Sequence, residues 1–218
     1  MLSQVPEKTD TVANPEPRWL AVVAMLAVGL LFGALPSYLS VGPRWLLLLV
    51  IAVLLVPTVA SHRAGHHDLS KALGFVGSAI LTAAMIWSIA LLVQAIPKHE
   101  IDPRVLLRSA VALWATNILV FALWYWRLDA GGPHEREKRE AHEEGAFLFP
   151  QMTPGAGPDP GWSPNFVDYL FLAFNTSTAL SPADTPALSR WAKILMMIQA
   201  TISLAVIALL AARAVNIL

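Results

Sequence analysis

The stretch that decides the fold is WSPNFVDYLFLAFNTSTALSPADTPALSRWAKILMMIQATISLAVIALLAARAVNIL, residues 162–218. It contains two apolar segments of unequal length, 166–180 and 191–216, with a polar turn between them. A helix rises about 1.5 Å per residue, so the first segment is too short to cross a hydrocarbon core of about 30 Å. Pro182 and Pro186 prevent this helix from continuing into the second segment. We therefore expect a re-entrant helix, which enters a membrane partway and turns back.

The end of the short segment carries four hydrogen-bonding side chains, Asn175, Thr176, Ser177 and Thr178. Irregular backbone at membrane depth must be buried in protein or face water. The helix dipole leaves about half a negative charge at this C-terminal end, where a cation would be stabilised.

The start of the short segment carries residues that are typical of a helix N-terminus. Ser163 is a good N-cap, and Pro164 suits the first helical position. Asp168 then lies in the first turn, beside the positive end of the dipole, which is a structural role for this carboxylate.

The turn after the short segment resembles the pore loop of potassium channels, Thr-x-Thr-Thr-Val-Gly-Tyr-Gly-Asp followed by x-x-Pro. The matching residues are Thr176, Ser177, Thr178, Ala179, Leu180, Ser181, Pro182, Ala183 and Asp184, followed by Thr185 and Pro186. As in that family, the turn follows a short aromatic helix and precedes a basic residue, Arg190, that opens the last span. Ser181, Pro182 and Ala183 replace Gly-Tyr-Gly, and they cannot freely adopt the backbone angles that glycine allows.

The resemblance implies a filter-like site in which backbone carbonyls replace the hydration shell of a monovalent cation. It also implies a homo-oligomer, a tetramer if channel-like, around a shared axis. The implied site comprises Asn175, Thr176, Ser177, Thr178, Ala179, Leu180, Ser181, Pro182 and Asp184, with Asp168, Asn117 and Arg190 in support. The whole chain also resembles an uncharacterised group of bacterial multi-pass membrane proteins. That likeness implies a bacterial inner-membrane location but no activity.

Composition agrees with a membrane protein. Of the 218 residues, 56% are hydrophobic and 14% charged, against about 25% charged in soluble domains. Zero net charge gives no reason to expect nucleic-acid binding, and the absence of cysteine removes thiol chemistry. No nucleophile with a base, and no metal-ligand set, can be picked out at membrane depth. We therefore expect no enzyme, cofactor or metal.

The chain as a whole predicts an all-α polytopic protein with about five transmembrane helices plus the re-entrant helix. We divide it into a polar tail (1–18), a four-helix transmembrane region (19–127), a hydrophilic loop (128–163) and the re-entrant module with the final span (164–218). The four earlier spans are expected at 19–40, 44–61, 72–96 and 105–126. The charges of the hydrophilic loop predict a solvated helix or arm.

Two polar features of the four-helix region have open interpretations. Asn117, near the middle of its span, is either glue between helices or part of an aqueous path. His62, His66, His67 and Asp68 could place two imidazoles on one helical face for a metal, or they form an ordinary interfacial loop.

Orientation and function also remain open at this stage. Ten of the fifteen Lys and Arg residues fall at the end that holds the N-terminus, which favours that end as cytoplasmic. A potassium-channel pore loop would instead enter from outside. Our first hypothesis is an ion-channel-like, cation-conducting oligomer with an atypical filter. The alternative is a non-conducting helical scaffold or assembly protein in which the same polar break closes by hydrogen bonds.

Overall fold

The computed structural model describes residues 16–40, 42–95, 102–139, 145–153, 162–179 and 184–215. Every regular element among them is a helix, so the expected all-α class is confirmed. The α-helices are α1 (Trp19–Gly33), α2 (Leu46–Arg63), α3 (His67–Ala95), α4 (Pro103–Leu128), α5 (Pro133–Glu137), α6 (Phe166–Thr178) and α7 (Arg190–Val215). The short 3-10 helices are η1 (Ser37–Leu39), η2 (Asp129–Gly131) and η3 (Pro150–Met152).

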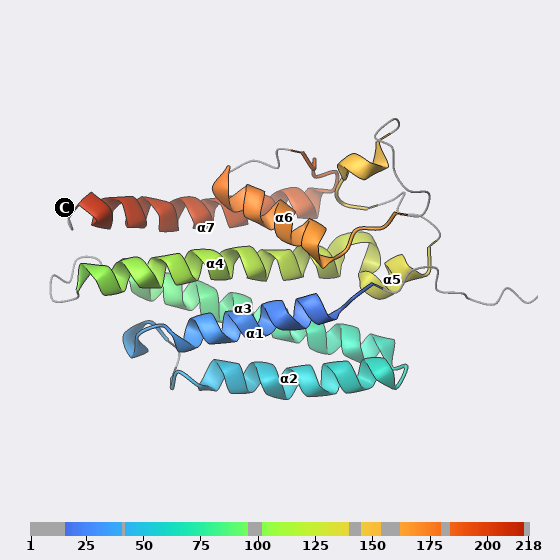
Figure 1. The fold of residues 1–218 in the computed structure, drawn as a ribbon, viewed down its shortest axis with the longest axis horizontal. Coiled ribbons are helices and arrows are strands. Elements are labelled where there is room, and N and C mark those ends of the chain that lie inside the picture. The colour runs from blue at the N-terminus through green and yellow to red at the C-terminus, as the bar shows by residue number, and fades with distance from the viewer. Residues whose placement is uncertain are drawn as a thin grey trace, which may run out of the picture.

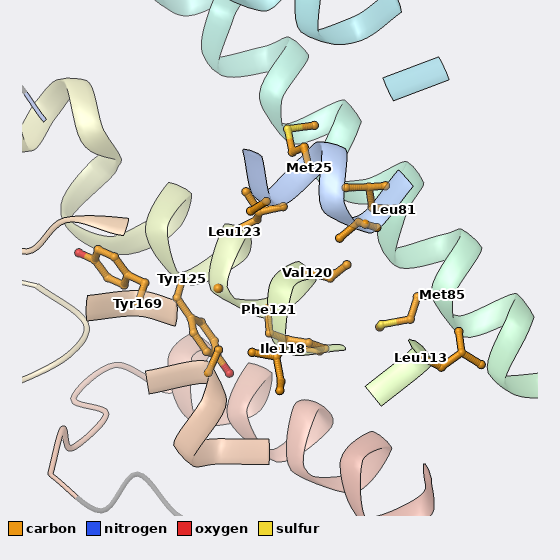
Figure 2. Packing of buried hydrophobic residues seen from close by; sticks show 14 of the residues in the cluster. Met25, Leu81, Met85, Leu113, Ile118, Val120, Phe121, Leu123, Tyr125 and Tyr169 are labelled. Atoms are coloured by element: carbon orange, nitrogen blue, oxygen red, sulfur yellow. The ribbon is translucent and has the colours of Figure 1, made fainter. Parts of the chain in front are cut away.

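Helix α4 lies at the centre of the molecule. It contacts α1 and α3 on one side and α6 and α7 on the other (Figure 1). Apolar side chains of α4 therefore fill the core in both directions. Figure 2 shows Leu113 of α4 beside Met85 of α3, both fully buried. Tyr125 extends from α4 toward α6 and α7 (Figure 2).

Four helices are long and apolar enough to cross a membrane: α2, α3, α4 and α7. The expected first span is shorter, because α1 has 15 residues and ends at Gly33. At about 1.5 Å per residue this is about 22 Å, less than a typical hydrocarbon core. Pro36 accounts for the end, since a residue that precedes proline disfavours helical backbone. The chain continues instead through η1.

The hydrophilic loop, in the parts that the structure describes (128–139, 145–153 and 162–163), is packed onto the bundle, which differs from the solvated helix or arm that its charges suggested. Arg136 of α5 is 2% exposed, and Phe147 is fully buried. The Phe147 ring packs against Tyr125 of α4 and Trp191 of α7, at 5.2 and 5.9 Å between centroids. This loop therefore closes one end of the molecule over α4 and α7.

Candidate functional site

The start of α6 is held by a reciprocal cap. Asn165 Oδ1 accepts a hydrogen bond from the Val167 amide, and Asp168 Oδ2 accepts one from the Asn165 amide, both at 2.8 Å. The cap is therefore Asn165, and the expected cap at Ser163 is wrong by two residues. Asn165 has the extended backbone of a cap, with Asp168 three residues later to complete the capping box. Asp168 thus stabilises the first turn of the helix.

The far end of α6 lies halfway along the bundle. Ser203 Oγ of α7 donates to the carbonyl oxygen of Ser177 at 2.6 Å. Ser203 is thirteen residues beyond Arg190, or about 20 Å along α7, which has 26 residues in all. Helix α6, with 13 residues, therefore ends beside the midpoint of α7.

The chain then returns to the end from which α6 started. The Leu188 amide donates to the Ala146 carbonyl at 2.7 Å, and the Leu148 amide donates to the Pro186 carbonyl at 3.0 Å. This pairing places the residues before α7 next to the loop before α6, near Phe147. Figure 1 shows α6 entering beside α7 and ending part-way along it. Helix α6 is thus a half-helix with its entry and return on the same side.

A buried set of side chains fastens the half-helix to α4 and α7. We call this set the polar clamp; its members are Asn117, Tyr125, Ser177, Gln199 and Ser203, all 0% exposed. Gln199 is its centre. Its Nε2 donates to the Ala173 carbonyl at 2.7 Å and to Ser177 Oγ at 2.8 Å. Its Oε1 accepts from the Tyr125 hydroxyl at 2.5 Å.

Asn117 joins the clamp from α4. Its Nδ2 donates to the Gln199 carbonyl at 3.3 Å and lies 3.5 Å from Ser177 Oγ. Its Oδ1 has no hydrogen-bond partner in the part of the chain that the structure describes. Trp114, one turn earlier on α4, donates through Nε1 to Ser203 Oγ at 3.1 Å. Of the two interpretations of Asn117, these contacts match interhelical glue.

The threonines of the filter-like set bond to their own helix. Thr176 is buried, and its Oγ1 donates to the Leu172 carbonyl at 2.8 Å. Thr178 is exposed, and its Oγ1 donates to the Phe174 carbonyl at 2.9 Å. Both hydroxyl protons are therefore used within α6.

The remaining predicted site residues do not gather in one place. Asn175 is half-buried, Ala179 is the exposed C-cap of α6, and Asp184 and Arg190 are exposed. Leu180, Ser181 and Pro182 lie outside the described residues. Of the twelve residues that the pore-loop resemblance implied, only Asn117 and Ser177 meet in the clamp.

A second polar group closes the loop end of the molecule. We call it the end network; it comprises Glu16, Asp129, Arg136 and Tyr169. The Tyr169 hydroxyl donates to Asp129 Oδ2 at 2.6 Å, and Arg136 Nη2 lies 2.8 Å from Glu16 Oε2. The Arg136 guanidinium also lies over the Tyr169 ring, 5.0 Å from its centroid. Burial raises the pKa of Glu16, although the charge of Arg136 opposes this shift.

Most members of the polar clamp and of the end network were not predicted from the sequence. A signal existed for Gln199 and Ser203, because polar residues four apart within an apolar span mark a buried helix face. No comparable signal marked Asp129 or Arg136. Both stand in a charged stretch that resembles solvated surface.

The histidines gather near the same end without forming a metal site. The rings of His62 and His67 are 5.3 Å apart, and His67 stacks on His134 of α5 at 3.8 Å. His66 is exposed. Among the described residues there is no group of three or more His, Asp or Glu side chains that could hold a metal.

Comparison of the chain with protein families, curated proteins and solved structures gave no match. The site must therefore be interpreted from its own chemistry.

Proposed function

We propose that this protein is a non-conducting, multi-pass membrane scaffold in which the half-helix α6 is a packed structural element. One observation carries the proposal. The hydroxyl groups that α6 brings to membrane depth, those of Thr176, Ser177 and Thr178, are bonded within the same chain, to Gln199 of α7 or to carbonyls of α6 itself, and the Ser177 carbonyl accepts from Ser203 of α7.

The energetics of the membrane interior support this proposal. A polar group without a partner in hydrocarbon costs several kcal/mol, so a re-entrant break needs water, an ion or protein partners. At the end of α6 the clamp supplies protein partners to Ser177, through both its Oγ and its carbonyl oxygen. A filter needs oxygens that are free to replace the hydration shell of an ion. The carbonyls of Ala173 and Ser177 are instead occupied by side-chain donors.

A cation-conducting oligomer, such as a tetramer of a bacterial inner membrane, is the second candidate, and one observation favours it. Thr178 is exposed at the C-terminal end of a half-helix that stops at the middle of the bundle. The negative end of the helix dipole lies there, as in pore helices aimed at a cation. Exposed apolar side chains of α6, Val167, Phe171 and Phe174, would then face a neighbouring copy.

Ion flux separates the two candidates. The protein is reconstituted into liposomes with a K⁺ or Na⁺ gradient, and flux is followed with an ion-sensitive dye. The scaffold proposal expects flux equal to that of protein-free liposomes.

Two variants sharpen the test. Thr178→Val removes the exposed hydroxyl, and Asp184→Asn removes the exposed carboxylate, neither of which contributes to the clamp. Flux that exceeds the protein-free level and falls in either variant would overturn the scaffold proposal and support the channel. Cross-linking in the liposomes gives the subunit number, and a monomer would exclude a shared axis.

A further inference from the structure

A cavity of about 410 Å³ opens at the end of the molecule where α1, α2, α3 and α4 meet α5. It lies outside the half-helix and its clamp. Two kinds of side chain line it. Part of the lining is basic, and part is apolar.

The basic part contains more positive than negative charge. Its permanent cations are Arg18, Arg63, Lys71 and Arg127, and its carboxylates are Asp68 and Glu135. Glu135 is already paired with Lys138 at 3.0 Å, and Arg18 with Glu137 at 2.7 Å. Arg63, Lys71 and Arg127 therefore face a single remaining carboxylate, that of Asp68.

Of the three cations in the cavity without an ion pair within the described part of the chain, Arg127 is the one that is not exposed. Its Nε donates to Ser78 Oγ at 3.0 Å, and its Nη2 lies 3.5 Å from Met25 Sδ. No carboxylate in the described residues lies within ion-pair distance of it. A charge held among apolar groups is costly unless it is paired. An anion in the cavity would supply the pair.

The backbone makes room for this arginine. A Cβ atom added to Gly74 would lie 1.9 Å from Arg127 Nη1, so even alanine at position 74 would displace the guanidinium. Beside the same cavity, His67 Nδ1 is buried and has no hydrogen-bond partner among the described residues.

The apolar part extends the cavity into the bundle. Phe75 lies eight residues below His67 on α3, which corresponds to about 12 Å along the helix. Met25 also lines the cavity; it approaches Gly77, and its Sδ lies 3.5 Å from Arg127 Nη2. At the rim, Trp19 is 62% exposed, as is typical of aromatic residues at a membrane interface. Arg63 and Lys71 are exposed, whereas the Arg127 guanidinium lies deeper, beside Gly74 and Ser78 and thus at the level of Phe75, so cations and apolar side chains line the cavity together.

We propose that this cavity binds an anionic phospholipid, with the lipid phosphate at Arg127 and Lys71 and the apolar part of the lipid against other apolar residues of the lining, such as Val22, Leu55 and Val59. Basic pockets between transmembrane helices on the cytoplasmic side recognise such headgroups, and the charge bias favours this end as the cytoplasmic one. A free phosphate would bind the cations but would gain nothing from the apolar side chains that line the cavity. We therefore assign the site to a lipid and not to free phosphate.

The purified protein in a neutral detergent tests the assignment by native mass spectrometry and by the shift in Tm on ligand addition. The probes are short-chain phosphatidylglycerol, phosphatidylcholine of the same chain length, and glycerol phosphate. We expect phosphatidylglycerol to bind at least about ten times more tightly than either of the others, since one charge-assisted contact corresponds to about a tenfold change or more. Equal binding of the two lipids would overturn the anionic site. Glycerol phosphate binding as tightly as the lipid would overturn the lipid assignment.

Variants locate the binding. Arg127→Gln and Lys71→Gln should each weaken phosphatidylglycerol binding about tenfold, because each removes one charged partner. Gly74→Ala should weaken it with every charge retained. Arg108→Gln is the matched control, since it removes an exposed arginine from the opposite end of α4. A loss in the control equal to that in Lys71→Gln would overturn the site. Lys71 is exposed, so that variant keeps the test valid even if Arg127→Gln does not fold.

Discussion

Replacement of Gln199 by leucine tests the clamp most directly. The two side chains are similar in volume, so the substitution removes hydrogen bonds without opening a large cavity. Three bonds are lost, to the Ala173 carbonyl, to Ser177 Oγ and to the Tyr125 hydroxyl. Among these groups the Tyr125 hydroxyl suffers most, because Gln199 Oε1 is the acceptor for its proton and Tyr125 is fully buried.

The size of the effect follows from the environment. Interhelical hydrogen bonds in membrane proteins average about 0.6 kcal/mol, and a buried polar group without a partner costs about 1–3 kcal/mol. Gln199→Leu should therefore lower the free energy of unfolding by about 2–4 kcal/mol. Because two of the three lost partners, Ala173 and Ser177, lie on α6, the half-helix should detach before the rest of the bundle unfolds.

The measurement is denaturation in mixed micelles, followed by helical circular dichroism, with limited proteolysis of the α6 region as a local probe. Thr201→Val is the matched control on the same helix, because Thr201 is exposed and its Oγ1 bonds only to the Met197 carbonyl of α7. It should change stability by less than about 0.5 kcal/mol.

A double-mutant cycle isolates the bond between Gln199 and Tyr125. Adding Tyr125→Phe to Gln199→Leu removes the orphaned hydroxyl, so the double variant should be less destabilised than the sum of the single variants by about 1 kcal/mol. The reasoning fails if Gln199→Leu costs no more than Thr201→Val, or if the two substitutions are additive.

Three further predictions concern the loop end of the molecule. Arg136→Met leaves the Glu16 carboxylate buried without its partner and should cost about 3–5 kcal/mol in denaturation, whereas a cost below 1 kcal/mol would show that the pair is not buried in solution. Burial and the neighbouring charge of His67 lower the pKa of His134 in the folded protein from its ordinary value of 6.5. The unfolded chain therefore takes up the proton first, and Tm should fall as pH drops below about 6.5. His134→Phe, which keeps a ring on His67, should flatten this dependence, and an unchanged Tm profile would contradict the assignment. Asn165→Ala removes the N-cap of α6 and should lower the free energy of unfolding by about 1 kcal/mol in the same denaturation assay. An unchanged free energy of unfolding would contradict the role of Asn165 as the cap.

Much of the fold could be predicted from the sequence, because long apolar runs between prolines and charges leave few alternatives in a membrane. The last two helices illustrate this. Their start and end residues differ from the expected ones by at most two positions wherever the structure describes them. The first span was overestimated, because Ala34 and Leu35, and then Tyr38 and Leu39 beyond Pro36, were counted as part of the apolar run.

The site was less predictable, for a physical reason. Hydropathy locates a helix along the membrane normal but does not say which face of it meets another helix. Ser177 and Asn117 were singled out, yet their common partner Gln199, 22 and 82 residues away along the chain, was not. Arg136 was missed for a different reason. It lies in a charged stretch, and nothing in the sequence distinguishes it, the arginine that becomes buried, from its charged neighbours.

The position of the clamp partners has a consequence for biogenesis. The ribosome completes α6 before it makes Gln199 and Ser203, so the side-chain donors that α7 supplies to Ala173 and Ser177 do not yet exist at that moment. Helix α6 can therefore reach its fully bonded position only after the last helix has been made.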